Sequence, residues 1–255
     1  MSDTADGEFH GRRVLITGGA RGIGAATAEL LLRRGARVAI GARSEASVAA
    51  FNTGRDTPAL AAVGELRDRE SCQRVVDSAC ERLGGLDCLI NCAGVFEEVA
   101  FEAVTQQHWD DTCQINVAGT FFAIQAALPA LEASGGNVVN LGSDAGLIGY
   151  PPSSVYSGAK AAVVNLTRAL ALELAGRIRL NCVCPGNVAT EMIDRAAQRS
   201  VDPTAYLASA HARAPMGRMA EPGEVAEAIL YLASPRASFT HGAILSVDGG
   251  GVCGF

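Results

Sequence analysis

Short runs of apolar, often β-branched residues alternate along the chain with longer segments in which apolar residues recur at helical spacing. The short runs predict strands at residues 14–16, 38–40, 60–63, 86–90, 137–141, 179–183 and 243–247. The longer segments predict helices at residues 23–34, 45–52, 70–83, 107–133, 155–175 and 222–233. Strands that alternate with helices are typical of a parallel sheet covered on both faces. We therefore expect one α/β domain over residues 1–255, with a seven-stranded parallel sheet.

Three segments depart from this alternation. Residues 187–220 are polar and irregular, with one or two short helices, and we expect them to form a lid over a substrate site. We expect residues 1–10 to be flexible. The long helix at residues 107–133 should bend near Pro129 or be interrupted near Asn116.

Composition narrows the class of protein. The chain is 49% hydrophobic and 19% charged, so it can build a sizeable core. Its net charge is −6 and no basic stripe occurs, which argues against nucleic acid as a partner. The first residues lack the apolar stretch of a signal peptide, and we find no charge-free apolar run of transmembrane length. We expect no contact with a membrane.

The chain contains eight cysteines and four histidines. Paired CxxC motifs do not occur, and the histidines are scattered, so we predict buried thiols and no metal site. Thiol richness without a signal peptide fits a reducing, cytoplasmic location.

The polar and glycine-rich motifs all follow predicted strands. They are Gly18–Gly24 after the first strand, Arg43 after the second, Asn91–Gly94 after the fourth, Ser143 after the fifth and Pro185–Thr190 after the sixth. In an open parallel sheet, ligands bind beyond the carboxyl ends of the strands. We therefore expect these motifs to converge on one crevice.

The first motif, TGGARGIG at residues 17–24, lies between a strand and a helix. Glycines there let the backbone approach a pyrophosphate, and the helix N-terminus offers free N–H groups. The alternative is a tight connection with no ligand.

Many dinucleotide folds carry a carboxylate directly after the second strand to hold the ribose diol. Here no carboxylate occurs after that strand until Glu45. Arg43 and Arg21 could instead face a 2′-phosphate, which suits a guanidinium fork better than a diol does. This favours NADP(H), with NAD(H) as the second possibility. The alternative is that both arginines are ordinary solvated charges.

Tyr156 and Lys160 are four residues apart on a predicted helix, so they share a face. A phenol titrates near pH ~10 and is a poor acid or base at neutral pH. An ammonium beside it favours the phenolate, which makes the pair a proton-transfer device. The alternative is that Tyr156 packs and Lys160 is solvated.

Taken in order, the motifs resemble those of the classical short-chain dehydrogenase/reductase family, and the ketoreductases similar to 3-oxoacyl-[acyl-carrier-protein] reductase in particular. The resemblance covers about residues 10–250 and implies a Rossmann-type doubly wound fold. It rests on TGGARGIG at 17–24, NCAG at 91–94, Asn116, Ser143, YSGAK at 156–160 and PGNVAT at 185–190.

The resemblance implies a role for four residues. Tyr156 would donate a proton to the carbonyl oxygen in reduction or accept it in alcohol oxidation. Ser143 would hydrogen-bond that oxygen. Lys160 would lower the pKa of Tyr156 and bind the nicotinamide ribose. Asn116 would interrupt its helix and anchor a water that relays protons to Lys160.

The resemblance also implies the cofactor cleft. It would be formed by Gly18, Gly22, Ile23, Gly24, Asn91, Ala93, Gly94, Pro185, Gly186, Val188 and Thr190, together with Tyr156 and Lys160. Glu65, followed by Leu66, would replace the usual Asp at the adenine. Cys92 replaces the second Asn of the usual NNAG.

We therefore expect an NADP(H)-dependent carbonyl reductase or alcohol dehydrogenase that acts on a small molecule. The alternatives are an NAD-linked dehydrogenase of a secondary alcohol or cyclic dihydrodiol, and a non-catalytic dinucleotide sensor. Residues 95–101, 144–154 and 187–220 would line a mostly apolar pocket, unless their apolar residues are core or oligomer contacts. The resemblance implies a homotetramer built on the helices at 107–133 and 155–175 and on the last strand.

Overall fold

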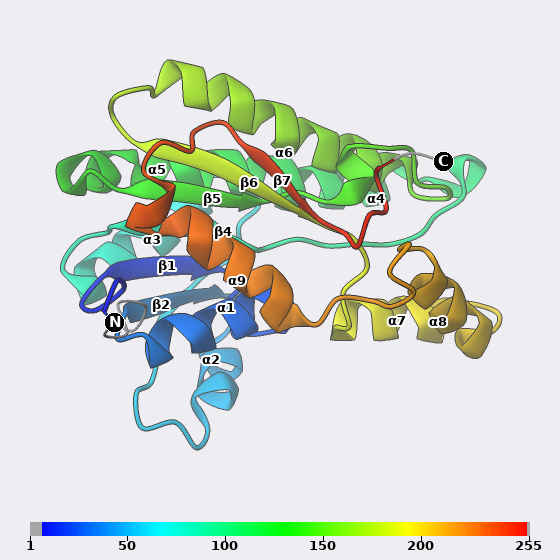
Figure 1. Cartoon of the computed structure of the whole chain (residues 1–255), viewed down its shortest axis with the longest axis horizontal. Coiled ribbons are helices and arrows are strands. Elements are labelled where there is room, and N and C mark those ends of the chain that lie inside the picture. The colour runs from blue at the N-terminus through cyan, green and yellow to red at the C-terminus, as the bar shows by residue number, and fades with distance from the viewer. Residues whose placement is uncertain (1–6, 254–255) are drawn as a thin grey trace.

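A single parallel sheet runs through the computed structural model, which describes residues 7–253 (Figure 1). The strands are β1 (Arg13–Thr17), β2 (Arg37–Ala42), β3 (Leu60–Val63), β4 (Cys88–Asn91), β5 (Asn137–Leu141), β6 (Arg179–Pro185) and β7 (Ile244–Val247). Their order across the sheet is β3-β2-β1-β4-β5-β6-β7, and every neighbouring pair is parallel. The predicted seven-stranded, doubly wound α/β fold is confirmed.

The strand order reverses at β1, which pairs with both β2 and β4. Thr17 at the end of β1 is level with Gly41 on one side and Asn91 on the other. The loops that follow β1, β2 and β4 therefore begin side by side at the same edge of the sheet. A crevice at such a switch point is the usual ligand site of this architecture.

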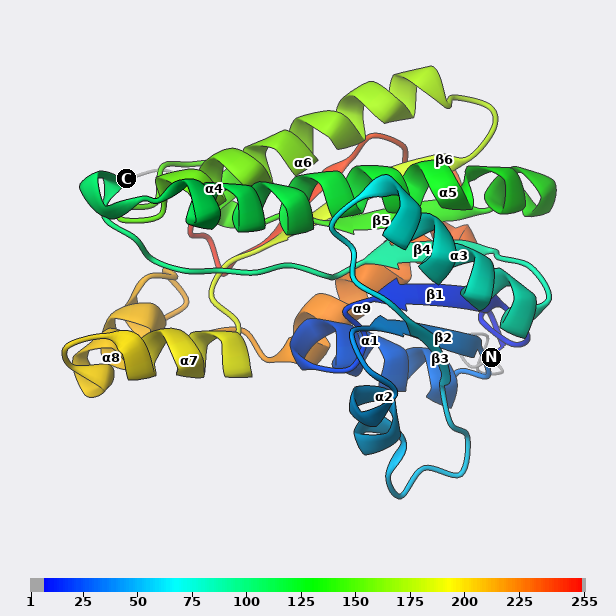
Figure 2. The ribbon, with the colours of Figure 1, turned by 180° about the vertical axis from the view of Figure 1, so that it is seen from behind.

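Helices cover both faces of the sheet, with α1 and α9 on one side and α3, α5 and α6 on the other (Figures 1 and 2). The α-helices are α1 (Gly22–Arg33), α2 (Glu45–Asn52), α3 (Arg69–Leu83), α4 (Gln106–Cys113), α5 (Gly119–Ser134), α6 (Ser154–Glu173), α7 (Glu191–Arg199), α8 (Pro203–Ala212) and α9 (Pro222–Ala233). Short helical turns are η1 (Phe101–Ala103), η2 (Gln114–Ala118), η3 (Asp144–Gly146) and η4 (Pro235–Ala237).

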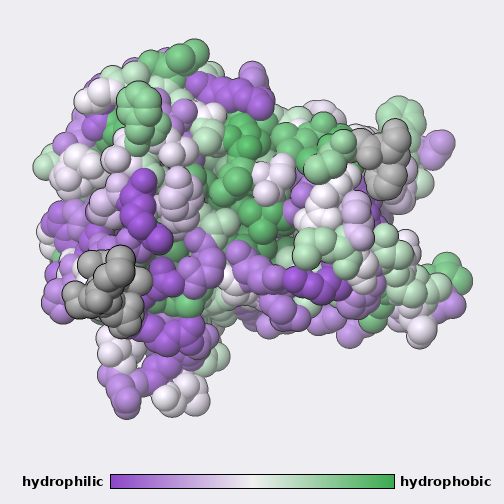
Figure 3. Space-filling model, in the orientation of Figure 1, coloured by the Kyte–Doolittle hydropathy of each residue, from purple (hydrophilic) through white to green (hydrophobic). Residues whose placement is uncertain are grey.

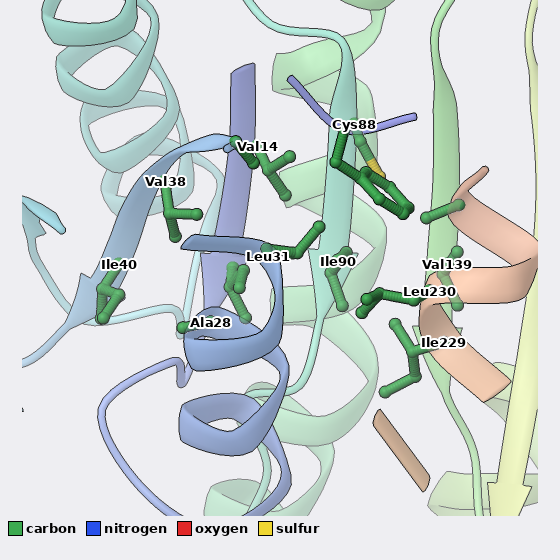
Figure 4. Close-up of a cluster of buried hydrophobic side chains, with 14 of the residues drawn as sticks. Val14, Ala28, Leu31, Val38, Ile40, Cys88, Ile90, Val139, Ile229 and Leu230 are labelled. Carbon is green, nitrogen blue, oxygen red and sulfur yellow. The ribbon is translucent and has the colours of Figure 1, made fainter. Parts of the chain in front are cut away.

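The core on the α1/α9 side is formed by branched residues of the central strands and by one apolar stripe from each helix. Figure 4 shows Ile40 and Ile90 of the sheet, Leu31 of α1 and Ile229 of α9, all fully buried in one cluster. Each such side chain contributes about 1.5–3 kcal/mol when it leaves water. Phe9 belongs to the same cluster and is fully buried, so this part of the segment expected to be flexible is tied down. Residues 1–6 lie outside the described residues.

The long helix is interrupted at Asn116, one of the two sites that the sequence indicated. η2 is a π-helical turn, and it joins α4 and α5 into one helical run, Gln106–Ser134, in which Pro129 is accommodated. Within the described residues this run is long and apolar enough to cross a membrane by length and composition alone, contrary to the sequence argument. A stripe of α5 nevertheless packs on α3 and on β4 and β5, as in a core helix.

Residues 187–220 contain α7 and α8, which lie beyond the carboxyl edge of the sheet and apart from its helical layers (Figure 1). Ile193 and Ala210 pack with Met219 in a small cluster of their own. The one or two short helices expected in this segment are therefore α7 and α8, and the segment's own apolar residues hold it together.

All eight cysteines are free, and Cys72, Cys88, Cys182 and Cys184 are buried. Burial raises the pKa of the Cys88 thiol to about 12. Among residues 7–253 no group of His, Cys, Asp or Glu has the arrangement of a metal site. Four thiols are therefore buried as the sequence predicted, whereas Cys80, Cys92 and Cys113 are half-buried and Cys253 is exposed.

Candidate active site

The glycine turn brings backbone against backbone. Gly18 has a φ of +68°, and a Cβ there would stand 2.8 Å from the Cα of Ala93. α1 begins at Gly22, and within the described chain no side chain caps its first turn, which carries no acidic residue. Its N–H groups are therefore open toward the crevice. This fits the pyrophosphate of a dinucleotide, because a helix N-terminus favours an anion.

Arg21 and Arg43 lie at the same corner of the sheet. The Gly18 N–H donates to the Gly41 carbonyl at 2.8 Å, and Arg43 is the second residue after that glycine. Both arginine side chains are exposed. The Nε of Arg21 is 3.8 Å from Oε2 of Glu191, a pair that solvent screens strongly. The corner therefore offers two cations.

Glu65 and Leu66 follow β3 at the same edge. The Glu65 carboxylate is exposed and lies 3.2 Å from Nε of Arg67, which also pairs with Asp111. The carbonyl of Leu66 contacts α5, where a Cβ on Gly119 would meet it. Glu65 thus has an ion pair of its own, and its contact with adenine stays a prediction.

A chain of buried polar side chains crosses the sheet beneath the crevice. Thr17 hydrogen-bonds Asn91 at 3.5 Å, Asn91 donates to Asn140 at 3.0 Å, and Asn140 donates to Thr167 of α6 at 3.0 Å. Thr17 also accepts from the Ala93 N–H at 3.2 Å. This network ties the glycine-turn strand to the helix that carries Tyr156. Thr17, Asn91 and Ala93 belong to motifs that the sequence indicated, whereas Asn140 and Thr167 belong to none.

Asn116 holds the loop after β4. Its Nδ2 donates to the carbonyls of Val95 and Thr112, both at 3.0 Å, and its Oδ1 accepts from the Val95 N–H at 3.1 Å. The side chain is fully buried. Gly94 passes so close that a Cβ there would stand 2.8 Å from Oδ1 of Asn116 and 3.7 Å from Nζ of Lys160.

Lys160 is buried in α6 and donates to the Leu141 carbonyl at 2.8 Å. Its Nζ is 5.8 Å from the ring centroid of Tyr156. Burial lowers the pKa of Lys160, since desolvation disfavours the ammonium. The two residues share a helix face, as their spacing predicted.

The pKa of Tyr156 moves opposite to the sequence expectation. Burial raises the pKa of the phenol above its ordinary value, and a hydrogen bond with Ser143 only opposes this. The Lys160 ammonium is directed to a backbone carbonyl and does not offset the desolvation. The ring of Phe96 packs edge-on against Tyr156, with centroids 4.9 Å apart.

Ser143 and Asp144 form a local hydrogen-bonded unit at the start of η3. The Ser143 hydroxyl donates to Oδ1 of Asp144 at 3.0 Å, and the Ala145 N–H donates to the same oxygen at 2.7 Å. Asp144 is buried, and its Oδ2 lies 3.6 Å from Nε of Arg213. Asp144 lies in the range 144–154 expected to line the pocket but was not singled out, although its place directly after Ser143 could have pointed to it.

The segment after β6 closes the crevice. Pro185 pairs with Val247 at the end of β6, and Gly186 packs against Asp248 so closely that a Cβ would lie 3.1 Å from its Cα. Thr190 contacts the glycine turn, since its Cγ2 would be 3.3 Å from a Cβ on Gly22. The segments predicted to flank the cofactor therefore meet, with Val188 buried and Ile23 packed on the core below them.

A cavity of about 390 Å³ lies between α8 and the segment after Ser143. Its walls include Tyr150, Asn187, Tyr206, Arg213 and Glu98. The sequence predicted mostly apolar walls, and that is wrong here. Most of the apolar candidates pack elsewhere in the protein or face solvent, as Met216 does.

The chain has extensive matches among known proteins. The family model described as enoyl-(acyl carrier protein) reductase matches residues 18–251. A cis-4-hydroxycyclohexanecarboxylate dehydrogenase from Sinomonas cyclohexanicum is 42% identical over 96% of this chain and 98% of its own. A 3-oxoacyl-[acyl-carrier-protein] reductase from Thermotoga maritima is 34% identical, over 95% and 98%.

Solved structures also match this fold over nearly the whole chain. The aldohexose dehydrogenase from Thermoplasma acidophilum superposes with a TM-score of 0.87 at 27% identity, covering 96% of this chain and 95% of its own. The family model and the relatives span nearly the whole chain, including every motif that meets at the crevice. The chain therefore belongs to the classical short-chain dehydrogenase/reductase family of oxidoreductases, whose members use nicotinamide dinucleotides.

Proposed function

We propose that this protein transfers a hydride between NADP(H) and a small-molecule carbonyl or secondary alcohol. The observation that carries the proposal is the meeting of Ser143, Tyr156, Lys160 and Asn116 at the carboxyl edge of the sheet, beside an open helix N-terminus. The bound nicotinamide supplies or accepts the hydride. The side chains of the protein position the substrate and move the proton.

In the reducing direction the carbonyl carbon gains the hydride and the carbonyl oxygen gains a proton from the Tyr156 hydroxyl. The phenol is protonated at neutral pH, as a general acid must be before it donates, although the pKa that burial raises makes it a weaker donor. Ser143 hydrogen-bonds the same oxygen once its hydroxyl turns from Asp144. Lys160 would hold the cofactor ribose and help to return a proton to Tyr156, and Asn116 would anchor a water for this relay. In the oxidising direction each transfer reverses.

The corner formed by Arg21 and Arg43 supports NADP(H) over NAD(H). Both side chains are exposed, and Arg43 follows β2 at the place where a carboxylate would hold a ribose diol. A 2′-phosphate would gain charge-assisted hydrogen bonds from these guanidinium groups.

The test is oxidation of NADPH and of NADH, followed by absorbance, over a panel of ketones, β-ketoacyl thioesters and quinones. Turnover with NADPH that Tyr156→Phe abolishes, and that Tyr231→Phe on α9 leaves intact, is the expected result. Cofactor binding, read from fluorescence quenching, should survive in Tyr156→Phe. Binding without turnover across the panel would point to the dinucleotide sensor instead.

We also propose a homotetramer in the cytoplasm. Support comes from apolar side chains that are exposed on the two helices expected to form the tetramer contacts. Trp109 of α4 is 52% exposed and Leu172 of α6 is 83% exposed. Figure 3 shows apolar residues gathered on the face over β6 and β7, and every residue of β7 is only half-buried. Native mass spectrometry that finds only a monomer would contradict the assembly.

A further inference from the structure

One charged side chain beside the reaction centre has no part in the proposed proton transfer. Arg213 directly follows α8 and lines the cavity of about 390 Å³. It is the single cation among the residues that line this cavity within the described chain. Tyr150, Asn187 and Tyr206 add further polar groups to the walls.

This cavity opens beside the catalytic groups. The ring of Phe96 packs on Tyr156 with centroids 4.9 Å apart and on Tyr150, a cavity wall, with centroids 6.4 Å apart. On the other side Asp144 connects Arg213 to Ser143. A substrate whose reacting oxygen meets Ser143 and Tyr156 would extend its far end into this cavity.

The guanidinium of Arg213 is held in place, but its N–H groups remain available as hydrogen-bond donors. Its central carbon lies 3.6 Å from the ring centroid of Tyr150, so the planar group is held against the aromatic ring. Nε faces Oδ2 of Asp144 at 3.6 Å, beyond hydrogen-bond distance. Within residues 7–253 none of the guanidinium N–H groups of Arg213 makes a hydrogen bond. A half-buried, preoriented guanidinium fork with free donors matches the two oxygens of a carboxylate.

Two acidic side chains share the neighbourhood and set where an anion can lie. Oδ1 of Asp144 accepts hydrogen bonds from Ser143 and Ala145, and burial raises the pKa of the Asp144 carboxyl. Glu98 accepts the Tyr206 hydroxyl at 3.1 Å and repels an anion from its side of the cavity. Among the described residues that line the cavity, Arg213 is therefore the place where a negative charge finds a positive partner, with the Asp144 carboxyl beside it.

We propose that Arg213 anchors a carboxylate of the substrate, so that the enzyme selects small ketones and secondary alcohols that carry a carboxylate remote from the reacting carbon. The inference rests on the proposed function and adds the substrate class. Because a remote carboxylate binds alike before and during hydride transfer, Arg213 acts mainly on KM.

The test compares 4-oxocyclohexanecarboxylate with its methyl ester as NADPH-dependent substrates. Wild type should prefer the acid. In Arg213→Met, kcat/KM for the acid should fall about 10- to 100-fold, mostly through KM, and change little for the ester. Glu98→Gln should raise kcat/KM for the acid alone. Arg199→Met, on the exposed face of α7, is the matched control and should alter neither substrate.

Equal losses for acid and ester in Arg213→Met would overturn the proposal, because they would assign Arg213 a structural role through Asp144. Turnover of the ester without preference for the acid in wild type would overturn it while the reductase function stands. No turnover of the acid, of the ester or of the wider panel would contradict both the role of Arg213 and the proposed reductase function. Should Arg213→Met fail to fold, inhibition of wild type by cyclohexanecarboxylate, against no inhibition by cyclohexanecarboxamide, decides the point.

Discussion

The hydroxyl of Ser143 donates a 3.0 Å hydrogen bond to the carboxylate of Asp144, the residue that follows it. The orientation of the hydroxyl that should meet the substrate oxygen is therefore set by a buried acid. Burial raises the pKa of Asp144, against the opposing charge of Arg213 and the hydrogen bonds from Ser143 and Ala145, and Asp248 adds to the rise. The protonation of Asp144 is thus coupled to folding and to the serine.

We expect Asp144→Asn to change how stability depends on pH. The unfolded chain ionises Asp144 near pH ~3.9, whereas the folded chain keeps the proton to higher pH. Wild type therefore loses folding stability as pH rises from about 4 through the folded pKa, and the Asn variant lacks this loss. Urea unfolding at a series of pH values should show a difference in free energy that shifts in favour of the variant as pH rises. A difference that stays constant across the series would contradict the raised pKa.

We expect Gly94→Ala to damage both stability and cofactor binding. The added methyl would stand 2.8 Å from Oδ1 of Asn116, a buried atom fixed by its hydrogen bond to the Val95 N–H, so relief requires the loop to move. The cost should be about 1–3 kcal/mol of unfolding free energy. Gly223→Ala is the control, because nothing lies within 4 Å of its added methyl and alanine favours a helix. Equal stability of the two variants in denaturant titrations would rule out the close approach.

We expect three thiols with raised pKa values to resist alkylation in the native protein. Burial raises the pKa of Cys72 to about 11 and those of Cys88 and Cys92 to about 12, so the reactive thiolate is scarce at neutral pH. Iodoacetamide followed by peptide mass spectrometry should find exposed Cys253 modified and these three intact. All four should react in concentrated guanidinium chloride. Native labelling of Cys88 as fast as Cys253 would mean that β4 opens readily.

Motifs whose residues are neighbours in the chain could be read from the sequence. The spacing of Tyr156 and Lys160 on one helix, and the glycines that open α1, follow from local geometry, and the structure has them as expected. The parallel sheet covered on both faces also followed, since short apolar strands that alternate with helices are typical of it.

What the sequence did not reveal depends on contacts between distant segments. Asp144 and Arg213 meet only because the end of α8 lies near the start of η3, and no spacing encodes that approach. The polar cavity was missed for the same reason: Ile193 and Leu207 belong to the core of the α7/α8 segment and leave the walls to Tyr150 and Arg213. The pKa of Tyr156 was misjudged because desolvation is a property of the folded surroundings.

We expect Arg43 to decide between the two dinucleotides. Arg43→Leu should raise the KM for NADPH about 10- to 100-fold, the usual effect of losing hydrogen bonds to a charged group, and leave the KM for NADH nearly unchanged. The reason is its place directly after Ala42, at the corner that also holds Arg21. Steady-state kinetics with both cofactors and one ketone measures this. Arg82→Leu, an exposed arginine on α3 at the opposite end of the sheet, is the control and should change neither KM. A wild-type preference for NADH, or equal losses with both cofactors in Arg43→Leu, would exclude a 2′-phosphate site at this corner and favour an NAD-linked dehydrogenase.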